Sequence, residues 1–136
     1  MKKVIVLLAV IVAAASCKKE KQPAPESPNA MVKGYWIGKL GTDASNYIND
    51  FSILFKEDGT LRIYGLVLGT DTTNVDKFDG TYALTPDKKG LDLSYNHKGQ
   101  YTATLSGGFL NENKQIKGVW VVNGTANQGA FYLNKQ

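Results

Sequence analysis

The folded part of the chain opens with the stretch Met31-Val-Lys-Gly-Tyr-Trp-Ile-Gly-Lys-Leu-Gly41. Within it, Gly34-Tyr35-Trp36 places a glycine two residues before a large ring. The same spacing recurs in three further apolar runs: Gly80-Thr81-Tyr82, Gly118-Val119-Trp120 and Gly129-Ala130-Phe131. Residues two apart share one face of a β-strand, so each glycine leaves space for a bulky neighbour or lets the strand bend. The pattern therefore predicts a series of strands with room for large rings.

Short apolar runs and turn signals alternate about every ten residues after residue 31, as is typical of an all-β sandwich or barrel. All fourteen glycines lie in this part of the chain. No stretch shows a sustained helical period, so we expect little or no helix. We expect eight strands, at residues 32–41, 48–57, 60–69, 78–86, 90–97, 99–110, 115–123 and 129–135.

Most of these strands show one apolar and one polar face. In the second strand, Phe51, Ile53 and Phe55 share one side, and Ser52 and Lys56 lie on the other. This alternation is the pattern of antiparallel strands with one face on the core and one in water. The fold class predicted is an all-β, eight-stranded antiparallel up-and-down meander barrel, after a signal peptide and a proline-rich tether.

Two local features depart from this pattern. Gly107-Gly108 in the sixth strand predicts a β-bulge or a corner. The third and seventh strands are apolar on both faces. On the face where a polar residue is expected, the third strand has Leu66 and Leu68, and the seventh has Val119 and Val121. A partner, a second copy or the returning tether would then cover the outer wall there.

The connections between the strands fall into two groups. The second, fourth and sixth, at residues 57–60, 86–90 and 111–114, are tight hydrophilic turns. The first, third and seventh, at residues 41–47, 69–77 and 123–128, are longer and polar, and the fifth, at 97–99, is short. Odd and even connections of a meander lie at opposite ends. One end is therefore expected to be closed by tight hairpins, and the other to be open and ringed by polar loops.

The opening of the domain resembles the lipocalin and avidin-like barrels of the calycin group. The resemblance rests on Gly34-Tyr35-Trp36 at the closed end of a meander, followed by Glu57-Asp58-Gly59-Thr60-Leu61. It implies the barrel fold, with Trp36 buried near the closed end. It does not imply a biotin site, because Gly38 stands where the avidin family has a ligand-binding asparagine and Trp120 has no assignable counterpart.

Residues 1–16 predict a signal peptide. Lys2 and Lys3 precede an unbroken run of twelve apolar residues at 4–15. As a helix this run would span about 18 Å, too short for a hydrocarbon core of about 30 Å. Ala14-Ala15-Ser16-Cys17 supplies the small residues of a cleavage site and resembles the lipobox of bacterial lipoproteins, with Ala14 where leucine is more common. The resemblance implies that Cys17 is acylated; the alternative is an ordinary secreted protein.

Residues 17–30 predict a lipid-anchored flexible tether, and residues 31–136 the β-barrel domain. Residues 18–30 contain three of the four prolines, no glycine and no aromatic residue, as expected of an extended spacer. The predicted location is the cell envelope, with attachment to the outer membrane through the lipid on Cys17. The periplasmic and surface sides of that membrane both remain open.

The charge of the domain argues against nucleic acid as a partner. The whole chain has a net charge of +4, but residues 31–136 contain eleven Lys or Arg and ten Asp or Glu, a net of +1. Nucleic-acid binding needs a basic face on the folded domain.

Residues for catalysis or metal binding are few. His97 is the only histidine, and we interpret it as a surface residue of a short turn. No serine lies in a strand–Gly-x-Ser-x-Gly–helix context. We therefore predict no enzymatic activity and no cofactor. Asp71, Asn74, Asp76 and Asp79 offer oxygen donors in and beside the third connection, but their spacing fits no calcium loop, so no metal site is predicted.

The predicted function is the binding of a small or extended ligand at the open end. An eight-stranded barrel either fills its interior or holds one small ligand, and the sequence leaves both cases open. Contacts with the ligand are expected from Tyr47, Phe78, Tyr95, Tyr101 and Asn123, with Asp71 and Asn74 at the rim. Alternatively, Tyr95 and Tyr101 pair across strands in an ordinary core. The alternative function is a protein-binding module, such as an inhibitor of an envelope enzyme.

Overall fold

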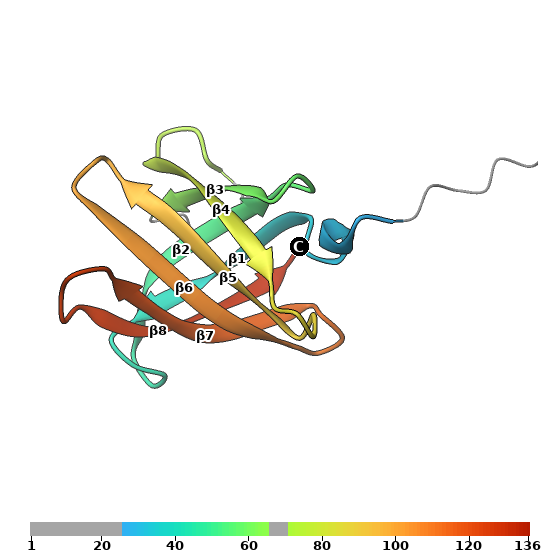
Figure 1. Cartoon of the computed structure of the whole chain (residues 1–136). Coiled ribbons are helices and arrows are strands. Elements are labelled where there is room, and N and C mark those ends of the chain that lie inside the picture. Colours follow the sequence, from blue (N-terminus) through green and yellow to red (C-terminus); the bar gives the residue numbers. More distant parts are fainter. Residues whose placement is uncertain (1–25, 66–70) are drawn as a thin grey trace, which may run out of the picture.

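The computed structural model describes residues 26–65 and 71–136 (Figure 1). Eight antiparallel strands follow one another in chain order and close into a barrel. They are β1 (Gly34–Gly41), β2 (Tyr47–Phe55), β3 (Thr60–Gly65), β4 (Lys77–Leu84), β5 (Gly90–His97), β6 (Tyr101–Leu110), β7 (Gln115–Val122) and β8 (Gln128–Lys135). The predicted all-β up-and-down barrel is confirmed, and it is consistent with a calycin-like fold. The expected continuation of β3 to residue 69 lies outside the described residues, as do the predicted signal peptide, Cys17 and most of the tether.

The two ends of the barrel differ in the way that the connection lengths predict. The tight turns after β2, β4 and β6 lie at one end, and the remaining connections lie at the other (Figure 1). In two of the tight turns an aspartate accepts a hydrogen bond from the backbone two residues on, Asp58 from Thr60 at 2.9 Å and Asp87 from Lys89 at 3.0 Å. This is the local geometry that makes aspartate a common turn residue.

A short 3-10 helix, η1 (Pro28–Met31), lies at the closed end beside the C-terminus (Figure 1). Ser27 caps it, and the Asn29 amide donates to the carbonyl of Glu57 in the β2–β3 turn at 3.1 Å. The Lys135 ammonium donates to the Met31 carbonyl at 2.8 Å. The ordered contacts of the domain therefore begin before residue 31.

In the part of the chain that the structure describes, no helix has the length and hydrophobicity needed to cross a membrane.

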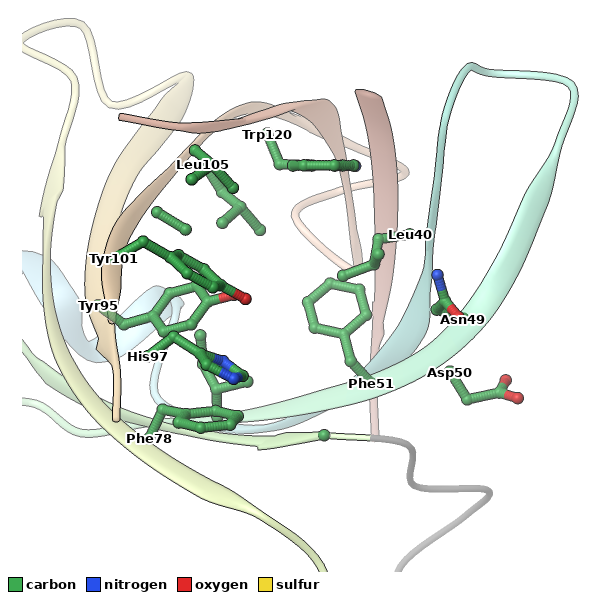
Figure 2. Close-up of a pocket in the computed structure, with 14 residues that line it drawn as sticks. Leu40, Asn49, Asp50, Phe51, Phe78, Tyr95, His97, Tyr101, Leu105 and Trp120 are labelled. Atoms are coloured by element: carbon green, nitrogen blue, oxygen red, sulfur yellow. The ribbon is translucent and has the colours of Figure 1, made fainter. Parts of the chain in front are cut away.

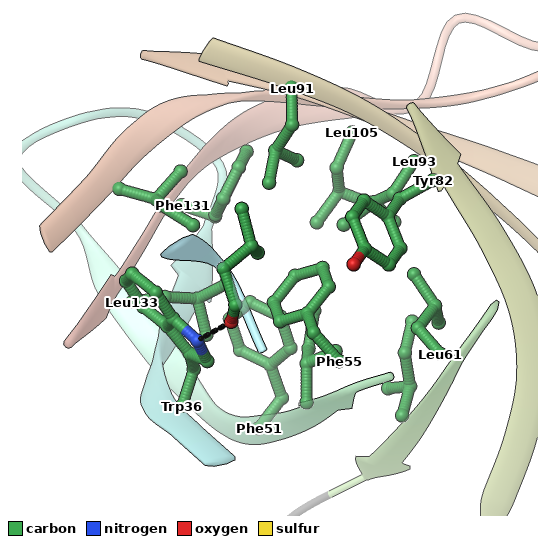
Figure 3. Close-up of a cluster of buried hydrophobic side chains, with 14 of the residues drawn as sticks. Trp36, Phe51, Phe55, Leu61, Tyr82, Leu91, Leu93, Leu105, Phe131 and Leu133 are labelled. Carbon is green, nitrogen blue, oxygen red and sulfur yellow. Dashed lines mark hydrogen bonds between the residues drawn. The ribbon is translucent and has the colours of Figure 1, made fainter. Parts of the chain in front are cut away.

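Trp36 lies in the core near the closed end, as the sequence predicts. Its side chain has no exposed surface, and its indole N–H donates to the Val32 carbonyl at 2.8 Å (Figure 3). The edge-on Phe55 ring lies with its centroid 6.1 Å away, and the Lys135 ammonium lies 5.7 Å from the centroid of the Trp36 ring. Trp36 on β1 therefore interacts with the segment before that strand (Val32), with β2 (Phe55) and with β8 (Lys135).

The remaining core side chains point inward from alternate positions of the strands. Those with almost no exposed surface include Phe55, Phe131, Ile53, Leu61, Leu91, Leu93, Leu105, Ile116 and Leu133 (Figure 3). They come from six strands that the chain brings together by closing the barrel, so the core is built mainly from contacts between residues distant in sequence.

Of the bulge or corner predicted at Gly107-Gly108, the bulge does not form, because both glycines pair in unbroken register with β5 and with β7. Gly107 has a different role: a Cβ there would lie 2.7 Å from Ile116 and 2.9 Å from the Phe131 ring. The glycine therefore makes space for a large neighbour. The register shift lies instead between Leu40 and Gly41, where β1 meets β2.

The outer wall of β7 carries two exposed valines. Val119 and Val121 point away from the core and are 57% and 36% exposed, so the described residues leave this apolar strip largely uncovered. On β2, by contrast, the outward Ser52 is fully buried, and its hydroxyl lies 2.6 Å from that of Tyr35. The apolar second face predicted for β3 includes Leu66 and Leu68, which lie outside the described residues.

Candidate ligand cavity at the open end

A cavity of about 280 Å³ occupies the open end of the barrel (Figure 2). Its walls are formed by Leu40, Asn49, Asp50, Phe51, Ile63, Gly65, Phe78, Tyr95, His97, Tyr101, Ala103, Leu105, Trp120 and Val122. Several of them flank the odd-numbered connections, the group that the sequence places at the open end. The interior is thus filled at the closed end and hollow at the open end, a division that the sequence alone leaves undecided.

One wall of the cavity is a stack of three rings from three neighbouring strands. The His97 ring lies between Phe78 and Tyr101, with ring centroids 4.4 Å and 4.6 Å away. The planes of His97 and Tyr101 are nearly parallel, at 5°. Tyr95 lies beside the stack, 5.7 Å from Phe78. Both faces of the imidazole are therefore covered, and only its edge is left to meet a ligand.

The β5–β6 turn places His97 in this stack. Alternation along β5 directs Leu93, Tyr95 and His97 to the inside, and the strand register sets His97 directly opposite Tyr101. The turn between them is tight: Lys98 and Gly99 both have positive φ, 50° and 75°. Glycine adopts this conformation at little cost, which allows the reversal to follow at once after His97.

The opposite wall is largely apolar. Leu40, Phe51 and Trp120 face the ring stack across the open space (Figure 2). The Trp120 indole N–H donates to the carbonyl of Gly41 at 2.9 Å, so its single polar atom is satisfied within the barrel wall. Gly129 permits this placement, because a Cβ there would lie 2.7 Å from the indole nitrogen. A ligand in the cavity would meet a fixed apolar surface on this side.

Most of the polar groups come from the ring-stack side, and the amide of Asn49 lies on the opposite side, beside Leu40. Figure 2 shows the Tyr101 hydroxyl and the nitrogens of His97 directed into the open space. Among the described residues, no side chain or backbone group forms a hydrogen bond with these atoms or with the Tyr95 hydroxyl. Burial, and to a lesser degree the nearby Tyr101, raises the pKa of Tyr95 to about 12. Tyr95 therefore keeps its proton throughout the physiological pH range and can donate it to a ligand.

Charged groups near the cavity are paired with one another. Asp50 binds Lys39 at 3.1 Å, and Figure 2 shows its carboxylate directed away from the open space. Asp76, in the β3–β4 connection, binds Lys98 at 2.8 Å. The cavity therefore presents hydroxyl, imidazole, amide and apolar groups, and the nearby carboxylates are held in ion pairs at its rim.

Of the residues predicted to bind a ligand, the structure brings Phe78, Tyr95 and Tyr101 together in the cavity. Tyr95 and Tyr101 are diagonal neighbours, because Tyr95 lies opposite Ala103 and Tyr101 opposite His97. The two tyrosines are therefore diagonal across the strands, and the residue directly opposite Tyr101 is His97.

Two other predicted residues lie on the outside of the barrel. The register shift beside Leu40 sets Tyr47 opposite Gly41 and leaves Ile48 unpaired, so the alternation that would direct Tyr47 inward is broken. Its ring packs on Tyr132, with centroids 4.9 Å apart. Asn123 follows the inward Val122, and its amide oxygen accepts a hydrogen bond from the Thr104 hydroxyl at 3.3 Å on the outer face.

The two predicted rim residues lie in the β3–β4 connection, outside the cavity itself. Asn74 lines a shallow hollow next to it, which also touches Phe78 and His97. The Asp71 carboxylate accepts a hydrogen bond from the Thr73 backbone at 3.0 Å, and the hydrogen bonds from Thr73 lower its pKa. These contacts are those of an ordinary loop.

Sequence reasoning missed His97, Trp120, Leu40 and Asn49 as cavity residues. For His97 a signal was present: the alternation that directs Leu91, Leu93 and Tyr95 inward continues to His97 at the end of the strand. We interpreted it as a turn residue instead, and the structure corrects this. Asn49 carries no comparable signal, because asparagine in a strand is equally common on a polar outer face.

The acidic residues of the third connection do not form a metal centre. Asp79 makes a bidentate ion pair with Arg62 at 2.7 and 2.9 Å, which lowers the pKa of the carboxyl, and Asp76 pairs with Lys98. Within residues 26–65 and 71–136, no group of three His, Cys, Asp or Glu side chains is placed to hold a metal ion.

No protein-family model matches this chain, and a search of curated proteins finds no match either.

Proposed function

We propose that this protein is a non-catalytic binding protein that takes up a small ligand in the cavity at the open end of its barrel. The observation that carries the proposal is a hollow, largely apolar chamber at one end of an otherwise filled barrel. Ligand pockets are usually apolar cavities with a few polar groups that fix orientation. The tyrosine hydroxyls and the imidazole edge are such groups here.

The volume limits the ligand. Pockets for small molecules usually measure about 300–1,000 Å³, and this cavity of about 280 Å³ lies at the lower limit. A ligand with one ring, or the end of an extended molecule, fits this volume. A lipocalin-like role in carrying such a molecule agrees with the fold.

Catalysis and a bound cofactor are not part of the proposal. His97 has a ring on each face, and the nearest rim carboxylates, Asp50 and Asp76, are held in ion pairs. Nucleic acid is also left out, because the net charge of residues 31–136 is only +1.

A lipid anchor at the cell envelope is the second part of the proposal, and it rests on the Ala-Ala-Ser-Cys17 sequence. The tether would enter at η1, on the closed end, opposite the cavity. Metabolic labelling with a palmitate analogue tests the anchor. We expect label on the wild-type chain and none on Cys17→Ala; equal labelling of the two would contradict it.

Filling the cavity tests the binding function. We expect native mass spectrometry of the full chain, purified from its host, to show an added small-molecule mass that disappears in Ala103→Phe. Ala103 lines the cavity and is 2% exposed, so a large ring there occupies the ligand's space. The matched control is Thr102→Phe, because Thr102 is the next residue on β6, points outward and is not part of the cavity wall.

The same measurement separates the alternative function. The exposed Val119 and Val121 on the outer wall would suit a protein-binding module. A co-purified protein, with no small-molecule mass in the wild type and no effect of Ala103→Phe, would contradict the ligand proposal and support that alternative.

A further inference from the structure

The polar groups on the ring-stack side of the cavity, Tyr95, Tyr101 and His97, can each donate a hydrogen bond. A tyrosine hydroxyl donates one hydrogen bond and can also accept, and an imidazole donates through at least one nitrogen. Tyr95 and Tyr101 have no hydrogen-bond partner among the described residues, and the Tyr101 hydroxyl points into the open space (Figure 2). A ligand group that accepts hydrogen bonds would satisfy these donors without any movement of the wall.

The ring edges favour the same kind of ligand. An aromatic ring is negative on its face and positive at its edge. Both faces of His97 are covered, by Phe78 and Tyr101, and each of those rings has one face against His97. The stack therefore offers much less ring face to a cation than an aromatic cage would, and its free edge suits an electron-rich atom.

Among the described residues, the carboxylates beside the cavity are held in ion pairs, so neither is free to balance a cationic ligand. Asp50 and Asp76 are paired with Lys39 and Lys98, and the Asp50 carboxylate points away from the space. A buried charge without a partner is strongly disfavoured. This argues against an ammonium group. It argues less strongly against a carboxylate, because the hydroxyls and the imidazole can donate hydrogen bonds to one.

We propose that the ligand of this cavity is compact and uncharged, and that its polar group is a carbonyl-type hydrogen-bond acceptor held by Tyr95, Tyr101 and His97. The inference rests on the proposed function and adds the chemical class of the ligand. The apolar body would lie against Leu40, Phe51 and Trp120 on the opposite wall.

Four molecules with nearly the same skeleton test this proposal: acetophenone, ethylbenzene, 1-phenylethylamine and benzoate. Binding to the full chain can be followed by the NMR signal of the Trp120 indole N–H, because Trp120 lines the cavity. The indole signal of the fully buried Trp36 is the internal control. We expect acetophenone to bind roughly tenfold more tightly than ethylbenzene, and the amine and benzoate to bind more weakly than acetophenone.

Two variants assign the effect to the named donors. Tyr95→Phe and Tyr101→Phe should each weaken acetophenone binding by about three- to tenfold and leave ethylbenzene binding unchanged. Tyr132→Phe is the matched control, because Tyr132 packs on Tyr47 on the outer face. The melting temperature of each variant shows that the fold is retained.

The outcomes separate this inference from the function on which it rests. If all four molecules bind equally well, or the amine binds most tightly, the acceptor proposal is overturned and the cavity remains a binding site. The same conclusion holds if both phenylalanine variants keep wild-type affinity for acetophenone. If none of the four shifts the Trp120 signal and the purified protein carries no small molecule, both proposals are wrong.

Discussion

Trp36→Ala is expected to lower the free energy of unfolding by about 3–5 kcal/mol, the usual cost of removing a large ring from a core. The ring has no exposed surface, packs edge-on against Phe55 and donates its N–H to Val32. Its removal leaves a cavity and an unpaired carbonyl next to η1. Because typical domains are stable by only about 5–15 kcal/mol, many chains of this size would unfold in part at 25 °C.

Chemical denaturation followed by circular dichroism measures this effect. The control is Trp120→Ala, where the loss should be clearly smaller, because that ring is only partly buried and already borders open space. A change of less than about 1 kcal/mol for Trp36→Ala, or an equal change for both variants, would contradict the placement of Trp36 as the central side chain of the closed end.

Alanine at Gly107 and at Gly108 should change stability in opposite directions. A Cβ at Gly107 would lie 2.7 Å from Ile116, 2.9 Å from Phe131 and 3.0 Å from the Lys117 carbonyl, so we expect a loss of about 1–3 kcal/mol from overpacking. A Cβ at Gly108 would have one neighbour within 4 Å, the Lys89 carbonyl at 3.7 Å. Since neither glycine has a positive φ, alanine at Gly108 should stabilise by about 0.4–1 kcal/mol.

The two variants differ by one position and share the same strand, so thermal unfolding of both under one condition compares them directly. If both variants lose the same stability, the loss would come from the backbone of β6 and not from contact with Ile116 and Phe131. Stabilisation by Gly107→Ala would mean that space exists beside Phe131, contrary to the packing described here.

The architecture was predictable from sequence because it depends on short-range regularities. A strand has a side-chain period of two, so Phe51, Ile53 and Phe55 identify an inner face without any knowledge of their partners. Connection length then separates the open end from the closed end in an up-and-down barrel. These two properties were enough to predict all eight strands and the end at which the cavity lies.

The residues of the cavity were harder to predict, because they depend on register. Tyr47 lies outside because one extra residue, Ile48, separates it from the regular part of β2, and the register shift that causes this is not visible in the sequence of β2 alone. The stack of Phe78, His97 and Tyr101 brings together three strands, and the contribution of each is one inward residue at a strand end. A strand boundary misplaced by one residue is enough to hide such a group.

Closure of the barrel also decides how this protein can meet other proteins. Each of the eight described strands has a hydrogen-bonded neighbour on both sides, including β1, which pairs with β2 and with β8. A sheet with a free edge exposes a row of unpaired N–H and C=O groups, onto which a further strand from another chain can add. The closed barrel removes that row along its paired strands. Association by strand addition is thereby disfavoured, including the edge-to-edge pairing that leads to aggregation. Any partner of the described domain would have to recognise side chains, such as the exposed Val119 and Val121, or the loops at the open end.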